Sequence, residues 1–108
     1  MKIKPFRQCM FMLDELLSCF ECIEFIEPVP ETATVYLQEI KQPMDFITLE
    51  ENLLNNKYKT YQDFRQDLEL IWTNATTFHR DFDLIYKQAV ALKDRFLTLE
   101  SYLFSGAK

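Results

Sequence analysis

The stretch VYLQEIKQPMDFITLEENL, residues 35–53, decides how the chain folds, because an irregular connection ends within it and a helix begins. Pro43 cannot donate a backbone hydrogen bond, and it disfavours helical geometry at the residue before it. Asp45 is a good N-cap residue for the apolar-periodic run that follows. Upstream, Val35 and Ile40 are too apolar for a freely solvated linker. We therefore expect the connection to fold back and pack on the domain.

Composition predicts a single helical domain over residues 1–108. The chain has only one Gly and four Pro, too few for the frequent turns of an all-β sandwich. Its hydrophobic share of 48% argues against disorder. A chain of this length buries about two-thirds of its unfolded surface in one core. We therefore expect an all-α fold.

The charge and the cysteines restrict the classes of partner and site. The net charge of −5 disfavours a nucleic-acid backbone as partner and suits a lysine-rich one, although acidic residues also simply solvate outer helix faces. Cys9, Cys19 and Cys22 are an odd number of cysteines, which indicates a reducing compartment. The Cys19-x-x-Cys22 pair lacks the context of a redox motif and the two further ligands of a zinc site. We interpret the three cysteines as buried small hydrophobic residues, and we expect no metal and no cofactor.

Apolar spacing predicts four helices and one long loop. In the first, third and fourth helices, apolar residues recur at alternating steps of four and three. Pro28 and Pro30 interrupt helical structure, so the loop contains at most a short turn around residues 35–39. The predicted helices span about residues 5–24, 46–55, 61–79 and 83–104, and the loop spans 25–45. The three stripes are Phe6, Met10, Leu13, Leu17 and Phe20; Phe64, Leu68, Ile71, Ala75 and Phe78; and Ile85, Ala89, Leu92, Phe96, Leu99 and Leu103.

The near-heptad rhythm of these stripes predicts how the helices pack. Such helices cross at a shallow left-handed angle, so the expected architecture is a left-handed four-helix bundle. If the first and third helices point the same way, the long loop and the turn at residues 79–83 lie at the same end of the bundle. We expect any functional site at that end.

A series of motifs, in order and spacing, resembles the bromodomain family, whose members read acetyl-lysine. Pro43-Met44-Asp45 follows Tyr36 at the family's distance, and Asn74-Ala75 stands in the third predicted helix. The other matching pieces are Phe25-x-x-Pro28-Val29, Ile40, Phe46-x-Thr48-Leu49, Leu53, Tyr58, Phe64-x-x-Asp67 and Phe78. The resemblance covers nearly the whole chain. It implies a left-handed four-helix bundle in which the long first loop and the last interhelical loop enclose a pocket.

The resemblance also implies a set of pocket residues. In the family, an Asn at the end of the third helix donates its side-chain amide to the acetyl carbonyl, and a loop Tyr reaches the same oxygen through a water molecule. The Tyr position is Tyr36, whereas the Asn position holds His79. The family's usual Trp-Pro before Phe25 is replaced by Ile23-Glu24. The implied apolar walls and entrance residue are Phe25, Val29, Phe78, Phe82 and Ile85.

Two hypotheses follow for the ligand. A reader of acetyl-lysine needs an apolar slot and a donor, because burying the acetyl carbonyl unpaired costs about 1–3 kcal/mol. His79 has an N–H in either neutral tautomer, so it can replace the Asn donor and bind acetyl-lysine weakly. Alternatively, His79 only caps the third helix, and the chain is a degenerate bromodomain that acts as a protein–protein interaction or structural module. In both cases we interpret Asn74 as a structural anchor for the backbone of the long loop.

An enzymatic function is not expected. His79-Arg80-Asp81 is the tripeptide of a kinase catalytic loop, but a chain with one Gly has no phosphate-binding loop. A single His with two carboxylates is typical of a solvated turn, in which Asp83 serves as the N-cap of the fourth helix.

The expected partners are acetylated histone tails or other lysine-acetylated nuclear peptides, together with chromatin-complex subunits that bind through a larger parent protein. We expect no direct nucleic-acid contact, no membrane contact and a location in the nucleus.

Overall fold

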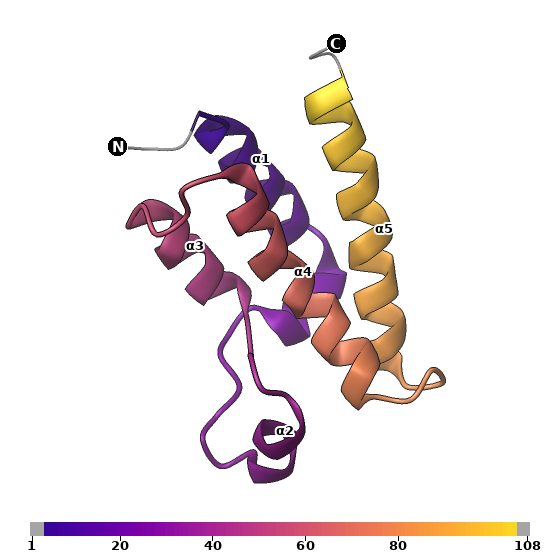
Figure 1. The fold of residues 1–108 in the computed structure, drawn as a ribbon. Helices are drawn as coiled ribbons and strands as arrows, with labels where there is room; N and C mark the ends of the chain where they lie inside the picture. Colours follow the sequence, from indigo (N-terminus) through magenta and orange to yellow (C-terminus); the bar gives the residue numbers. More distant parts are fainter. Residues whose placement is uncertain (1–3, 106–108) are drawn as a thin grey trace.

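The computed structural model describes residues 4–105, and within that range it contains helices and no strand. The elements are α1 (Phe6–Leu17), the 3₁₀-helix η1 (Phe20–Phe25), α2 (Thr34–Glu39), α3 (Phe46–Leu54), α4 (Tyr61–Phe78) and α5 (Leu84–Ser105) (Figure 1). The predicted all-α class is confirmed. Residues 1–3 and 106–108 of the predicted domain lie outside the described residues. None of the described helices is both long and apolar enough to cross a membrane.

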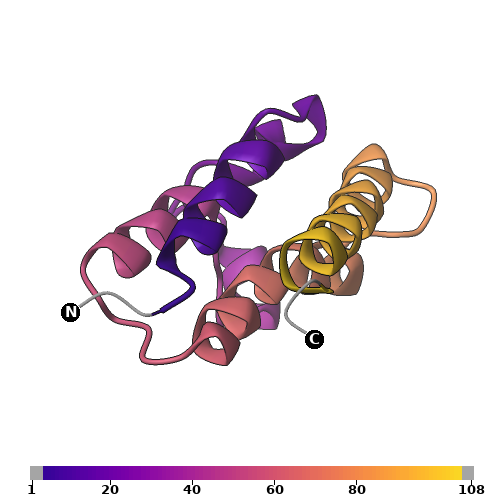
Figure 2. The same ribbon diagram turned by 90° about the horizontal axis from the view of Figure 1, so that it is seen from above.

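The helices α1, α3, α4 and α5 form the predicted four-helix bundle. Helix α1 packs on α3 and α5, and α4 packs on the same two helices, so the four close a ring (Figures 1 and 2). Fully burying one large apolar side chain contributes about 1.5–3 kcal/mol. The apolar stripes therefore supply the main force that holds the bundle together. Its largest buried side chains include Met12, Leu13, Leu49, Phe64, Leu68, Leu92 and Phe96.

Two side-chain caps fix where α3 and α4 begin. Asp45 accepts hydrogen bonds from the backbone N–H and the hydroxyl of Thr48, both at 2.7 Å. Thr60 accepts from the backbone N–H of Asp63, whose carboxylate accepts in return from the Thr60 N–H, each at 3.2 Å. Both caps satisfy backbone donors that have no partner within their helix. The Asp45 N-cap predicted from the sequence is thus confirmed, and the Thr60–Asp63 pair forms a capping box at the start of α4.

The first helix is shorter than predicted, because α1 ends at Leu17 instead of continuing to about residue 24. The Ser18 backbone N–H and hydroxyl both donate to the Asp14 carbonyl, at 3.1 and 2.8 Å. Cys19 then adopts an extended conformation (φ −88°, ψ 135°), which stops the α-helix. The cap formed by Ser18 satisfies a carbonyl that the ended helix leaves without a partner.

The 3₁₀-helix η1 follows this break, and its three-residue period changes which side chains are buried. Cys22 and Phe25, three residues apart, face the core. Phe20 and Ile23, also three residues apart, face solvent and are 70% and 61% exposed. The prediction that Phe20 continues the apolar stripe of the first helix is therefore wrong. The residues of α1 that are buried are Cys9, Met12, Leu13 and Leu16.

The long connection and the α4–α5 turn lie at the same end of the bundle. Helices α1 and α4 run in the same direction, so the connection that follows α1 and η1 and the turn that follows α4 meet at the end that carries α2 (Figure 1). The connection is packed, since Ile40 is only 4% exposed, and its short helical turn is α2. This end of the bundle holds the candidate site.

Burial predicts unequal reactivity of the three cysteines, all of which are free thiols. Burial raises the pKa of the Cys9 thiol to about 12, and it also raises the pKa of the Cys22 thiol. Cys19 is partly exposed, so its interpretation as a buried residue was wrong. Only the thiolate is nucleophilic, so iodoacetamide at about pH 8 should alkylate Cys19 first, as measured by peptide mass mapping.

The control for this experiment is the same reaction in denaturant, where all three cysteines should be labelled at similar rates. Labelling of Cys9 in the folded protein as fast as that of Cys19 would contradict the position of Cys9 in the core.

Candidate ligand-binding site

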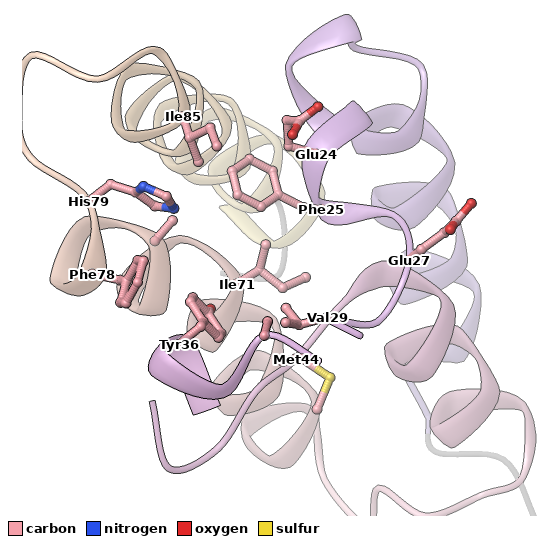
Figure 3. Close-up of a pocket in the computed structure, with 12 residues that line it drawn as sticks. Glu24, Phe25, Glu27, Val29, Tyr36, Met44, Ile71, Phe78, His79 and Ile85 are labelled. Atoms are coloured by element: carbon pink, nitrogen blue, oxygen red, sulfur yellow. The ribbon is translucent and has the colours of Figure 1, made fainter. Parts of the chain in front are cut away.

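A cavity of about 180 Å³ opens at the end of the bundle where the long connection meets the turn after α4 (Figure 3). Phe25 of η1 and Val29 and Tyr36 of the connection line one part of it. The last turns of α4 and the first turn of α5 line the rest. The residues from these two helices are Ile71, Ala75 and Phe78 of α4, His79 at its end, and Ile85 of α5.

Six of the seven residues expected around a ligand line this cavity, namely Tyr36, Phe25, Val29, Phe78, His79 and Ile85. The seventh, Phe82, does not: it is 72% exposed and lies outside the cavity lining. The turn at residues 79–83 is closed by two bonds between Arg80 and Asp83. The Asp83 N–H donates to the Arg80 carbonyl (2.9 Å), and the Arg80 N–H donates to the Asp83 carboxylate (3.2 Å). This tight closure leaves Phe82 on the outside of the turn, so its placement in the wall was wrong.

Asp83 also differs from its prediction as an N-cap. It stands directly before α5, but its carboxylate accepts the N–H of Arg80, which precedes it, rather than an N–H of the helix. Arg80 lies only three residues before Asp83 in a tight turn, so its N–H is within reach of the Asp83 carboxylate.

Several lining residues were not singled out in the sequence. Ile71 and Ala75 belong to the predicted stripe of the third helix and lie two turns and one turn before Phe78, respectively. Their helical spacing was the available signal, since positions three and four residues apart share a face. Glu24 and Glu27 also line the cavity. Charged residues beside Phe25 carried no periodic signal, so only the fold reveals them.

His79 presents an imidazole ring to the cavity from the end of α4. Its backbone N–H donates to the Ala75 carbonyl (2.9 Å), and its extended backbone (φ −92°, ψ 157°) ends the helix. The ring packs edge-on against Phe78, with centroids 5.1 Å apart, and points toward Ile85 in Figure 3. Nδ1 lies 3.9 Å from Asp83 Oδ2, too long for a hydrogen bond but within ion-pair range for a protonated ring. Among residues 4–105, neither ring nitrogen has a hydrogen-bond partner, so the ring can donate to a ligand.

Tyr36 offers a second polar group on the opposite side. It lies in α2, and its ring packs edge-to-face on Phe78 with centroids 4.8 Å apart. Burial raises the pKa of the Tyr36 hydroxyl, so it stays protonated and can donate at neutral pH. Within the described part of the chain the hydroxyl has no hydrogen-bond partner.

Two hydrogen bonds hold the connection over the cavity. Asn74 of α4, only 9% exposed, donates from Nδ2 to the Gln42 carbonyl at 2.8 Å. The Ile47 N–H donates to the Ile26 carbonyl at 3.0 Å and joins the two ends of the connection. An unpaired buried backbone carbonyl would cost stability, so the Asn74 bond both satisfies the connection and fixes its position.

The chemistry of the lining suits a neutral amide on an aliphatic stem. Its walls are mainly apolar, and two potential hydrogen-bond donors, the His79 ring and the Tyr36 hydroxyl, face it without a hydrogen-bond partner among residues 4–105. In volume it exceeds the ~150 Å³ cavity that accommodates benzene in a protein core. Within residues 4–105, no group of three His, Cys, Asp or Glu side chains is placed to hold a metal ion.

Comparisons with known proteins agree with this geometry. The family model described as Bromodomain matches residues 9–91. The chain is 38% identical over 86 residues to Bromodomain adjacent to zinc finger domain protein 2A of Xenopus laevis, which covers 79% of this chain and 5% of that protein. It is 31% identical over 99 residues to Bromodomain-containing factor 2 of Saccharomyces cerevisiae, which covers 86% of this chain and 16% of that protein. The chain thus spans only a small part of the curated relatives it matches.

Removing the Asn74 side chain tests how the connection is held. Asn74→Ala leaves the Gln42 carbonyl without its partner, so we expect the free energy of unfolding to fall by about 1–3 kcal/mol, measured by urea denaturation. Asn55→Ala is the matched control, because Asn55 is exposed at the end of α3 and its removal should change stability little. Equal stability of the two variants would show that this bond does not hold the connection.

Proposed function

The chain belongs to the bromodomain family, a family of acetyl-lysine reader modules, and on this premise we propose that its cavity binds an acetylated lysine of a nuclear protein tail. One observation carries the proposal. His79 and Tyr36, each without a hydrogen-bond partner among the described residues, line one apolar cavity. A buried acetyl carbonyl needs such a donor, and its methylene stem needs such walls.

In this proposal, each group has a separate role. An N–H of His79 donates directly to the acetyl carbonyl. The Tyr36 hydroxyl reaches the same oxygen through a water molecule, which serves nearly as well as a direct bond. Phe25, Val29 and Ile85 enclose the aliphatic stem of the lysine and exclude bulk water from around the amide.

Binding is proposed to be weak, because an imidazole replaces an amide. An Asn side chain carries a donor and an acceptor on one planar group, whereas the second nitrogen of His79 must find its own partner. Asp83 lies within ion-pair range of that ring, but at 3.9 Å it does not make a hydrogen bond. Part of the binding energy is therefore lost to an imperfectly paired ring.

The wider role follows from the length of the relatives. The chain matches 5% and 16% of two bromodomain proteins, so we propose that it works as a module of a longer protein. That protein would act in the nucleus, where acetylated histone tails are the principal ligands and other chromatin-complex subunits are bound by the rest of the parent. The module would recognise the mark and catalyse nothing.

Substitutions at His79 test the proposed donor, with binding followed by NMR shift changes on titration with an acetylated histone-tail peptide. His79→Phe keeps a ring but removes both nitrogens, so it should weaken binding about five- to 150-fold. His79→Asn restores a paired amide and should strengthen binding about fivefold or more. The unacetylated peptide is the control and should cause no comparable shifts at the cavity.

Equal shifts with acetylated and unacetylated peptides, or no shifts with either, would overturn the reader function. The alternative of a degenerate bromodomain that acts as an interaction or structural module would then stand. Unchanged affinity in His79→Phe, with acetyl dependence retained, would instead assign the donor role to another group.

A further inference from the structure

Glu24 stands at the edge of the cavity as a direct result of the 3₁₀ geometry of η1. It precedes Phe25, whose ring is buried in the wall, and it lines the cavity beside Phe25 and Ile85 (Figure 3). The Glu24 side chain is exposed, and within residues 4–105 it has no ion-pair or hydrogen-bond partner. No hydrogen bond or ion pair among the described residues therefore gives this carboxylate a structural role.

Glu27 is a second carboxylate on the same side. It also lines the cavity, although in Figure 3 its side chain points away from the centre. It too is exposed and without a partner among the described residues. A peptide that places one lysine in the cavity must leave it along the surface, and on this side it passes two unpaired negative charges.

The excess of negative charge in this chain comes from the segments at the cavity end. Residues 20–45 and 79–83, which form the cavity end, contain eight acidic and two basic residues. The rest of the chain holds the other nine of 17 acidic and ten of 12 basic residues, so it is close to neutral. One of the two bases, Lys41, donates to the Gln38 carbonyl of its own loop (2.8 Å). The segments around the cavity therefore carry a net negative charge, which attracts a cationic peptide.

We propose that this domain selects an acetyl-lysine that has an unmodified lysine or arginine among the residues next to it, and that Glu24 is the residue that recognises this cation. The inference rests on the proposed function, because it needs the acetyl group in the cavity. The acetyl amide itself is neutral and gains nothing from Glu24. The carboxylate thus acts on the neighbouring residue and determines specificity, while the cavity binds the mark.

The expected effect is modest and depends on salt. Glu24 is solvent-exposed, and pairs of exposed charges contribute little, so one pair should change affinity by about two- to fivefold. Raising NaCl from about 0.05 to about 0.5 M should remove most of this difference, because the screening length becomes shorter than the distance between most surface charges.

The first experiment compares peptides on the unmodified domain. Each peptide has one acetyl-lysine in a Gly-Ser background, with a single arginine moved through the nearest positions on both sides, and affinities are measured by NMR titration. The matched peptides carry Gln in place of arginine. Arginine at one or two positions should strengthen binding by about two- to fivefold over Gln. Unacetylated versions of the same peptides should bind much more weakly.

The second experiment exchanges the charges. Glu24→Gln should abolish the preference, so that the arginine peptide and the Gln peptide bind the variant with equal affinity. Glu24→Lys should reverse the preference, so that a peptide with Glu at the same position binds better than the arginine peptide. Glu51→Gln is the matched control, since it removes the same charge from an exposed site on α3 and should keep the preference. The Glu24→Gln/Glu27→Gln double variant measures whether the second carboxylate contributes.

The outcomes separate the two proposals. Equal affinity for arginine and Gln peptides, with acetyl dependence retained, would overturn this inference and leave the reader function intact. Retention of the arginine preference in both Glu24 variants would assign it to another group and also overturn the role of Glu24. Equal binding of acetylated and unacetylated arginine peptides would overturn the reader function, and this inference with it.

Discussion

The hydrogen bond from Asn74 to the Gln42 carbonyl holds the functional end of this domain together. It joins α4 to the connection directly before Pro43, where the backbone cannot form regular helical bonds. The connection carries Tyr36, while α4 ends in His79. These two potential donors to a ligand thus sit on separate segments, and the buried bond helps to hold the segments together. The position of the connection over the cavity therefore depends on polar contacts as well as on the apolar core of the bundle.

In the proposed function, the apolar and the charged features of the cavity have separate roles in recognition. The walls and His79 suit a neutral amide, for which an added charge would only bring a desolvation cost. The carboxylates of Glu24 and Glu27 stay at the edge, in solvent. There a charge has little desolvation cost, and its interactions with other charges are weak and screened by salt. In the proposed function, general recognition of the acetyl amide in the cavity and selective recognition of a neighbouring charge at its edge are therefore compatible in one small domain.

Much of the fold was predictable because its signals are local. Asp45 and the Thr60–Asp63 capping box mark helix starts through contacts within three or four residues, and the structure has both. The stripes of α4 and α5 were also predictable, since long helices bury one continuous face. The resemblance placed six of seven expected residues around the cavity. Phe82 was misplaced because the closure of its turn depends on backbone bonds that the pattern of apolar residues does not report.

The sequence by itself determined the all-α class and the four-helix bundle, since helical periodicity and caps depend on near neighbours in the chain. Its resemblance to a known family indicated six of the residues that line the cavity. Only the tertiary structure decided that α1 stops at Leu17 and that η1 then turns Phe25 inward and Phe20 outward. It also decided that Glu24 reaches the cavity edge. A pattern of apolar residues indicates which side chains avoid water. Whether an α-helix or a 3₁₀-helix buries them depends on tertiary contacts, here on the packing of η1 against α5, which is distant in the sequence.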